Sequence, residues 1–211
     1  MRIVGGQVLS GGALIESDVA IDEDSGLIAA TSNGRVIDAR GLHVLPGIVD
    51  IHGDAFERQI MPRPGVGFPI DIALKDSDRQ CVSNGITTVF HSVTCSWEPG
   101  LRGVDNARAI LETIEANQES FAADTRFHLR YETYNLAAEA EVTRWVADGR
   151  VDMLAFNDHL PGPDTPPRIR KIAEMAERAG MSEDGFTALV TQLQGLANEV
   201  PSAIARLAAA A

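Results

Sequence analysis

Leu45-Pro46-Gly47-Ile48-Val49-Asp50-Ile51-His52-Gly53-Asp54 is the stretch that decides the fold of this chain. Its residues Ile48 to Ile51 form a short, mainly apolar run bounded by turn residues, which is typical of a buried strand. The Pro-Gly pair before the run marks a turn. His52 and Asp54 follow the strand directly, and both are residue types that bind metal ions. The sequence therefore predicts a strand that ends at a functional site.

The region before this stretch, residues 1–43, has a different pattern. Short apolar runs alternate there with turn signals such as Gly5-Gly6, Gly11-Gly12 and Asn33-Gly34. This spacing favours short antiparallel strands. We therefore expect residues 1–43 to form a small β-sandwich segment and residues 44–211 to form a second domain.

Three more strands are predicted in the second domain, each separated from the next by a stretch able to form a helix. The strands are expected at Gly85–Val93, Phe127–Glu132 and Val151–Phe156. Strands that alternate with helices indicate βα units around a parallel sheet, either open or closed. The predicted fold class is therefore α/β.

Several helices are predicted from capping residues and from apolar residues at helical spacing. One begins near Asp105, a good N-cap, and its apolar positions are Ala107, Ile110, Leu111, Ile114 and Phe121. Later ones are expected from Arg168 to Ala179, ending at Gly180, from Ser182 to about Asn198, and from Pro201 onward. The chain stops inside this last helix. An eight-stranded βα barrel takes about 250 residues, so we expect the front part of a longer, truncated barrel.

The composition is that of an ordinary globular protein, with 45% hydrophobic and 23% charged residues. The formal net charge of -12 argues against non-specific binding to nucleic acid or to anionic membranes. No apolar stretch approaches the roughly 20 residues of a membrane helix, and the first residues lack a signal-peptide core. These features predict a cytoplasmic protein. Its two cysteines, Cys81 and Cys95, are interpreted as buried thiols.

Candidate functional residues stand where the predicted strands end, because the active site of a parallel βα sheet lies at that edge. They are His52 and Asp54, then His91 and Cys95, then Glu132, and then Asp158 and His159. Imidazole and carboxylate groups are the ligands that a zinc-type ion prefers. Alternatives stay open for each group: a turn at His52 and Asp54, an ion pair of Glu132 with Arg130, and a loop cap at Asp158 and His159.

Two arginines follow the first strand closely and are candidates for binding phosphate. Arg58 and Arg63 carry guanidinium groups, which match phosphate oxygens in a bidentate way. Prolines on both sides of Arg63 restrict its loop. The alternative for both is an ordinary role in surface solubility.

The motifs together resemble a known group. The stretch from Leu45 to Asp54 is similar to the metal motif on the first strand of the amidohydrolase superfamily, whose usual form is His-x-His. Met61-Pro-Arg-Pro-Gly65, Gly85-Ile-Thr-Thr-Val89, His128-Leu-Arg-Tyr-Glu132 and Asn157-Asp-His159 narrow the resemblance to the diphosphatase family of phosphonate metabolism, in the carbon-phosphorus lyase pathway. The resemblance implies the N-terminal part of a (β/α)8 TIM-like, metal-dependent hydrolase barrel. It also implies release of diphosphate from α-D-ribose 1-methylphosphonate 5-triphosphate.

The resemblance also implies a set of roles. His52 and Asp54 would bind a divalent metal, expected to be zinc. Some members of the superfamily bridge two metals with a carbamylated lysine on a barrel strand. Lys75 and Lys171 are the only lysines here, and both lie outside the predicted strands. Glu132 would therefore serve as the further ligand. Asp158 and His159 would be catalytic, as a general base and a partner that orients water, or would be further metal ligands. Arg58 and Arg63, from their guanidinium chemistry, are expected to bind the substrate phosphates.

The expected partner is a small triphosphorylated ribose phosphonate, and a homo-oligomer is left open. The family's later metal ligands are absent from this chain, which puts its activity alone in doubt. Two alternatives remain: another amidohydrolase acting on C–N bonds, such as a deacetylase or a cyclic amidase, and a non-catalytic fragment that binds metal or phosphate.

Overall fold

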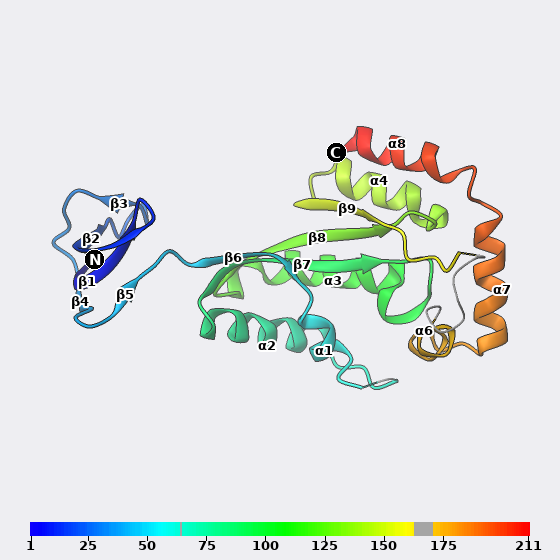
Figure 1. The fold of residues 1–211 in the computed structure, drawn as a ribbon, viewed down its shortest axis with the longest axis horizontal. Helices are drawn as coiled ribbons and strands as arrows, with labels where there is room; N and C mark the ends of the chain where they lie inside the picture. Colours follow the sequence, from blue (N-terminus) through cyan, green and yellow to red (C-terminus); the bar gives the residue numbers. More distant parts are fainter. Residues whose placement is uncertain (64, 163–170) are drawn as a thin grey trace. The chain divides into compact units, whose positions relative to one another are not determined.

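The structure is a computed structural model that describes residues 1–63, 65–162 and 171–211 (Figure 1). The chain divides into two compact units, Met1–Gly47 and Ile48–Ala211. Each unit is described separately below.

The first unit is one five-stranded mixed sheet. Its strands are β1 (Arg2–Ser10), β2 (Ala13–Ile21), β3 (Ile28–Ala29), β4 (Val36–Asp38) and β5 (His43–Val44). The order is β3-β2-β1-β4, and β5 also pairs with β1. Strands β1 and β2 form an antiparallel hairpin, whereas β4 and β5 run parallel to β1. Gly11 and Gly12 make the hairpin turn with positive φ values of 58° and 82°, a conformation that glycine adopts without strain.

The prediction of a β-sandwich for this segment is wrong. A sandwich buries two inner sheet faces against each other, but the unit has a single sheet and buries only Gly6 and Ala39 among its residues. Leu27 and Ile28 remain 68% and 82% exposed. The alternation of apolar runs and turns identified strands correctly, but it carries no information on whether a second sheet covers them.

The second unit is built on a four-stranded parallel sheet. Its strands follow the chain order β6 (Ile48–Gly53), β7 (Ile86–Cys95), β8 (Asp124–Glu132) and β9 (Met153–Asn157). The helices are α1 (Phe56–Ile60), α2 (Ile70–Ser83), α3 (Val104–Asn117), α4 (Glu139–Ala147), α6 (Ile172–Ala179), α7 (Glu183–Gln194) and α8 (Val200–Ala210), with short 3₁₀ turns at Gly100–Arg102, Gln118–Ser120 and Leu136–Ala138. All four predicted strands are present (Figure 1). The expectation that the first of them is buried is wrong, because β6 is an edge strand whose Ile48, Val49 and Ile51 are 54%, 56% and 58% exposed.

The predicted TIM-like barrel is not what the structure shows. The described residues form an open α/β sheet of four strands, and β6 and β9 are its two edges. Strand-helix alternation is shared by open and closed parallel sheets, so the sequence pattern could not distinguish them. The α/β class is correct. In place of the predicted sandwich and barrel, the chain has one five-stranded mixed sheet and one four-stranded parallel sheet.

The two faces of the parallel sheet differ in chemistry. Alternate residues of a strand point to opposite faces, and in β8 the residues Phe127, Leu129 and Tyr131 join the main core with helices α1, α2, α3, α4 and α8. Leu207 of α8 lies fully buried in this core, and α8 contacts α4. The opposite face of β8 carries His128, Arg130 and Glu132. Strand β8 thus has one apolar face under helices and one polar face.

The helix signals were largely correct. Ser182 caps α7 by accepting a hydrogen bond from the N–H of Gly185, and Gly180 ends α6 with φ of 68°. The N-cap of α3, however, is Gly103, and Asp105 lies in the first turn, where its charge favours the helix dipole. The predicted start at Arg168 lies outside the described residues. No helix in the described ranges is both long and apolar enough to span a membrane.

His91 should make the stability of the second unit depend on pH. It is 2% exposed and packs edge to face on Phe56, and burial lowers the pKa of its imidazole to about 4. The unfolded chain takes up this proton near pH 6.5, so the stability is present above that pH and is lost as the pH falls toward 4. We expect a loss of about 3 kcal/mol from this residue.

Urea unfolding at pH 7 and pH 4.5 measures this effect in the parent chain and in His91→Phe. The drop in the free energy of unfolding should be smaller in the variant. His43→Phe, at an exposed position in the first unit, should leave the drop unchanged. An equal drop in all three proteins would show that His91 does not cause it.

Candidate functional site

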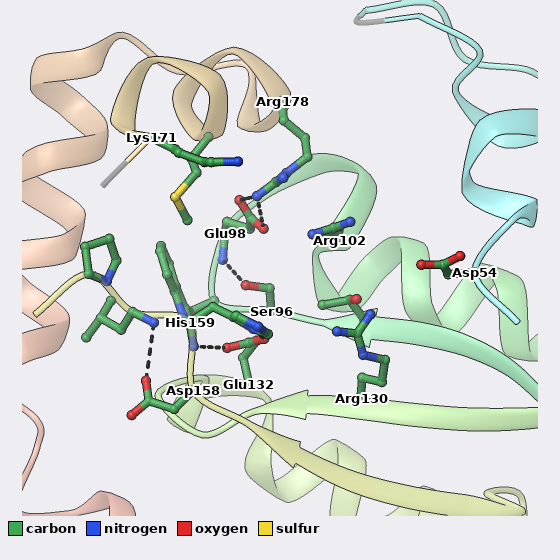
Figure 2. A pocket seen from close by; sticks show the side chains of 15 residues that line it. Asp54, Ser96, Glu98, Arg102, Arg130, Glu132, Asp158, His159, Lys171 and Arg178 are labelled. Carbon is green, nitrogen blue, oxygen red and sulfur yellow. Dashed lines mark hydrogen bonds and ion pairs between the residues drawn. The ribbon is translucent and has the colours of Figure 1, made fainter. Parts of the chain in front are cut away.

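A pocket of about 570 Å³ lies at the carboxyl ends of β7, β8 and β9 (Figure 2). Its lining residues are Asp54, Thr94, Ser96, Trp97, Glu98, Arg102, Arg130, Glu132, Asp158, His159, Leu160, Pro161, Lys171, Met175 and Arg178. They come from strand ends, from the connection after β7 and from α6. Parallel strands with short connections bring such residues to one edge of the sheet, so a pocket at this edge follows from the topology.

A carboxylate and an imidazole are paired at the mouth of this pocket. Glu132, which is 3% exposed, accepts a hydrogen bond from the backbone N–H of His159 at 3.0 Å. Its other oxygen lies 2.6 Å from Nδ1 of His159. An ionised carboxylate can only accept here, so Nδ1 carries the hydrogen, and in the neutral imidazole Nε2 is then the nitrogen with the lone pair. The His159 side chain is 62% exposed, and a buried carboxylate therefore holds an accessible base in a fixed orientation.

Asp158 has a different local role from its neighbour. One of its carboxylate oxygens accepts a hydrogen bond from the backbone N–H of Leu160 at 3.3 Å, which stabilises the turn after β9. This hydrogen bond supports the alternative in which Asp158 caps the loop. Asp158 also lines the pocket. Glu132 contacts His159 and not Arg130 through its carboxylate.

Four cationic side chains lie in the pocket wall, together with the four carboxylates of Asp54, Glu98, Glu132 and Asp158. The cationic side chains are Arg102, Arg130, Lys171 and Arg178, and Figure 2 shows the three arginines around the same space. Arg178 donates to both oxygens of Glu98 at 2.9 Å, and Arg102 donates to Glu57 at 2.7 and 3.2 Å. Ion pairs therefore hold two of the guanidinium groups in place.

The connection that carries Trp97, Glu98 and Arg102 is tightly anchored. The side-chain amide of Asn135 donates to the carbonyl of Ser96 at 2.8 Å, and the N–H of Ser96 donates to the carbonyl of Arg102 at 2.6 Å. Gly100 has φ of 82°, and a Cβ there would lie 3.3 Å from the carbonyl oxygen of Arg178. The close approach of α6 to this connection thus depends on a residue without a side chain.

The structure brings together four of the seven predicted site residues. Asp54, Glu132, Asp158 and His159 all line the pocket. His52, Arg58 and Arg63 are not among its lining residues. Arg58 instead lines a separate hollow beside α2, and the ring of His52 lies 5.4 Å from that of His128.

Sequence reasoning missed most of the cationic wall. Arg130 shares a strand face with Glu132, so the period of two could have identified it. Arg102 and Arg178 come from a 3₁₀ turn and from a helix, and no local pattern marks them. Only tertiary packing brings them to the strand ends.

The described residues do not fit a complete metal centre. No group of three histidine, cysteine, aspartate or glutamate side chains gathers in the described ranges closely enough to hold an ion. Both oxygens of Glu132 are engaged by His159. Nε2 of His128 is buried without a hydrogen-bond partner beside His52, but two imidazoles alone do not complete a zinc site. We therefore derive no chemical step through a metal.

Comparison with known proteins finds a partial match to an enzyme of phosphonate metabolism. The chain is 30% identical over 131 residues to the alpha-D-ribose 1-methylphosphonate 5-triphosphate diphosphatase of Escherichia coli (strain K12). The matched part is 61% of this chain and 35% of that protein, so the chain spans about a third of the length of the curated relative. No protein-family model matches the chain. The chain is thus distantly similar to part of a phosphonate diphosphatase.

Proposed function

We propose that this chain carries part of the active site of a hydrolase that releases diphosphate from α-D-ribose 1-methylphosphonate 5-triphosphate. The observation that carries the proposal is the pocket, in which an oriented imidazole faces a wall of cationic side chains. A triphosphate chain needs both a base for the attacking water and positive charge around the phosphoryl oxygens. The similarity to the Escherichia coli diphosphatase supports the same reaction.

His159 is the proposed general base. Its Nε2 takes a proton from water while the water oxygen forms a bond to the phosphorus nearest the ribose. The bond from that phosphorus to the bridging oxygen breaks, and diphosphate leaves with the electron pair. Glu132 holds the imidazole and stabilises the imidazolium that forms. Arg102, Arg130 and Arg178 offset the negative charge that develops on the leaving group.

Metal dependence remains a proposal that rests on His52 and Asp54. A divalent ion, expected to be zinc, is the cofactor that these two side chains would bind, and no step of the reaction above is assigned to it. The phosphate-binding roles of Arg58 and Arg63 also remain proposals, although the pocket offers other guanidinium groups for the same task. The expected partner is a small triphosphorylated sugar phosphonate.

The test is diphosphate release by the purified chain from α-D-ribose 1-methylphosphonate 5-triphosphate, measured with added zinc and after treatment with a chelator. Release that exceeds the no-protein control supports the hydrolase, and its loss after chelation supports the metal. Elemental analysis of the parent and of the His52→Ala, Asp54→Ala double variant tests the ligands independently of turnover. Equal zinc content in both proteins would contradict the metal assignment.

Substrates with C–N bonds test the alternative that the chain belongs to another kind of amidohydrolase. Release of acetate from N-acetylated sugars, or opening of cyclic amides, without release of diphosphate would overturn the proposed reaction. Adenosine triphosphate serves as a comparison substrate, because it shares the triphosphate and lacks the phosphonate. A chain that uses both equally would be a general triphosphate hydrolase.

A further inference from the structure

Three buried hydrogen-bond donors of the pocket-lining residues have no acceptor. They are the hydroxyl of Thr94, the indole Nε1 of Trp97 and Nε of Arg178, each without a hydrogen-bond partner in the described part of the chain. Leaving a buried donor unpaired costs a protein stability, and native structures contain few such groups. Three on residues of one pocket therefore call for a common explanation.

The three residues come from elements that pack against one another. Thr94 is the last residue but one of β7 and is the register partner of Arg130 in β8. Trp97 follows β7 and packs against the cluster formed by α6 and α7, and Arg178 lies in α6. The ion pair of Arg178 with Glu98 fixes the guanidinium against this connection. The three residues thus line the same pocket as Arg102 and Arg130.

All three groups can donate, and two of them can only donate. An indole N–H and a guanidinium N–H have no acceptor function, whereas a threonine hydroxyl can do both. A ligand that satisfies them must therefore present acceptors, and phosphoryl oxygens are acceptors only. Arg102 and Arg130 belong to the same lining, and their guanidinium groups can add charge-assisted hydrogen bonds to a phosphoryl group.

We propose that Thr94, Trp97 and Arg178 form a phosphoryl-binding subsite that holds the leaving diphosphate. This inference rests on the proposed function and deepens it, because it assigns the leaving-group side of the pocket to residues that no sequence motif marks. Thr94 and Trp97 are specificity residues that bind the ligand, and neither takes part in proton transfer.

Thr94→Val tests the subsite because it removes only the hydroxyl and keeps the shape of the side chain. An unpaired buried hydroxyl costs stability, so the midpoint of thermal unfolding should rise by ~2–4 °C in the absence of ligand. The affinity for inorganic diphosphate, measured by calorimetry on the whole chain, should fall about tenfold. Trp97→Phe keeps the aromatic ring and removes the N–H, and it should lower the affinity by a similar factor.

Thr125→Val is the matched control. Thr125 is also a buried strand threonine of the same sheet, but its hydroxyl donates to the carbonyl of Ala123 and it lines a different hollow. This variant should not gain stability, and its affinity for diphosphate should equal that of the parent. The combination of higher stability and weaker binding should therefore be specific to the pocket positions.

The outcomes separate this inference from the proposed function. If the chain releases diphosphate from the triphosphate while Thr94→Val leaves both diphosphate affinity and KM unchanged, the subsite is overturned and the hydrolase stands. If Thr94→Val weakens diphosphate binding but no release is seen, the subsite stands and the hydrolase fails. Absence of diphosphate binding by the parent chain, or an effect on ribose binding alone, overturns the subsite.

Discussion

A His159→Gln variant should release diphosphate about 10²- to 10⁴-fold more slowly than the parent chain, which is the usual contribution of a positioned general base. Glutamine has no ring nitrogen that can accept a proton from water at neutral pH. The loss should lie in kcat, because the exposed side chain is proposed to act on the attacking water rather than to hold the substrate. Steady-state kinetics of diphosphate release measures both parameters.

Glu132→Gln separates orientation from basicity in the same pair. Both carboxylate oxygens accept N–H groups of His159, whereas an amide offers one oxygen and would set its own N–H against a donor. The variant should therefore lose turnover although His159 remains. His43→Gln, which changes an exposed histidine of the first unit, is the control and should match the parent. Turnover of His159→Gln within about threefold of the parent would exclude His159 as the base.

Arg178→Met should produce the largest loss of stability among the ion-pair variants, about 3–5 kcal/mol. It leaves the carboxylate of Glu98, whose side chain is 5% exposed, buried without its cation. Arg150→Met is a close control, because Arg150 and Arg178 have the same exposure of 29%. The partner of Arg150, Glu115, is 43% exposed, so that variant should lose less than about 1 kcal/mol.

The two tryptophans of the chain allow this loss to be located. Trp97 packs against the cluster of α6 and α7, and Trp145 lies in the main core. In a Trp145→Phe background, fluorescence during urea unfolding reports α6 and α7 alone, and Arg178→Met should shift this transition to lower urea. Adding Glu98→Gln should recover part of the loss, because no buried charge is then left unpaired. Equal effects of Arg178→Met and Arg150→Met would show that burial of Glu98 does not matter.

Local sequence signals predicted the elements well and the architecture poorly. The four parallel strands and the cap at Ser182 follow from hydrophobic periodicity and from side-chain hydrogen bonding, which act within a few residues. The sandwich and the barrel depend on which faces are covered by distant segments, and short-range patterns do not contain that information. Asp105 illustrates the same limit, since an N-cap also needs the extended backbone that Gly103 adopts.

The residues of the site also divide into those that local sequence signals indicate and those that only tertiary packing brings to the pocket. Asp54, Glu132, Asp158 and His159 could be found because each ends or directly follows a strand, and the topology of parallel sheets gathers strand ends. Arg178 reaches the pocket from α6, about eighty positions after Glu98, through packing that no motif records. No local pattern indicates the pairing of Glu132 with His159 either, because the two residues are 27 positions apart in the chain.

The contact of α8 with α4 has a consequence for how the chain folds during synthesis. Leu207 completes a core whose other members include Val142 and Trp145. A ribosome adds ~5–20 residues per second, so α8 is synthesised several seconds after α4. During this time the apolar side of α4 cannot be buried by α8. A nascent chain in this interval offers chaperones an exposed apolar surface, and slowing translation between α4 and α8 would prolong its exposure to aggregation.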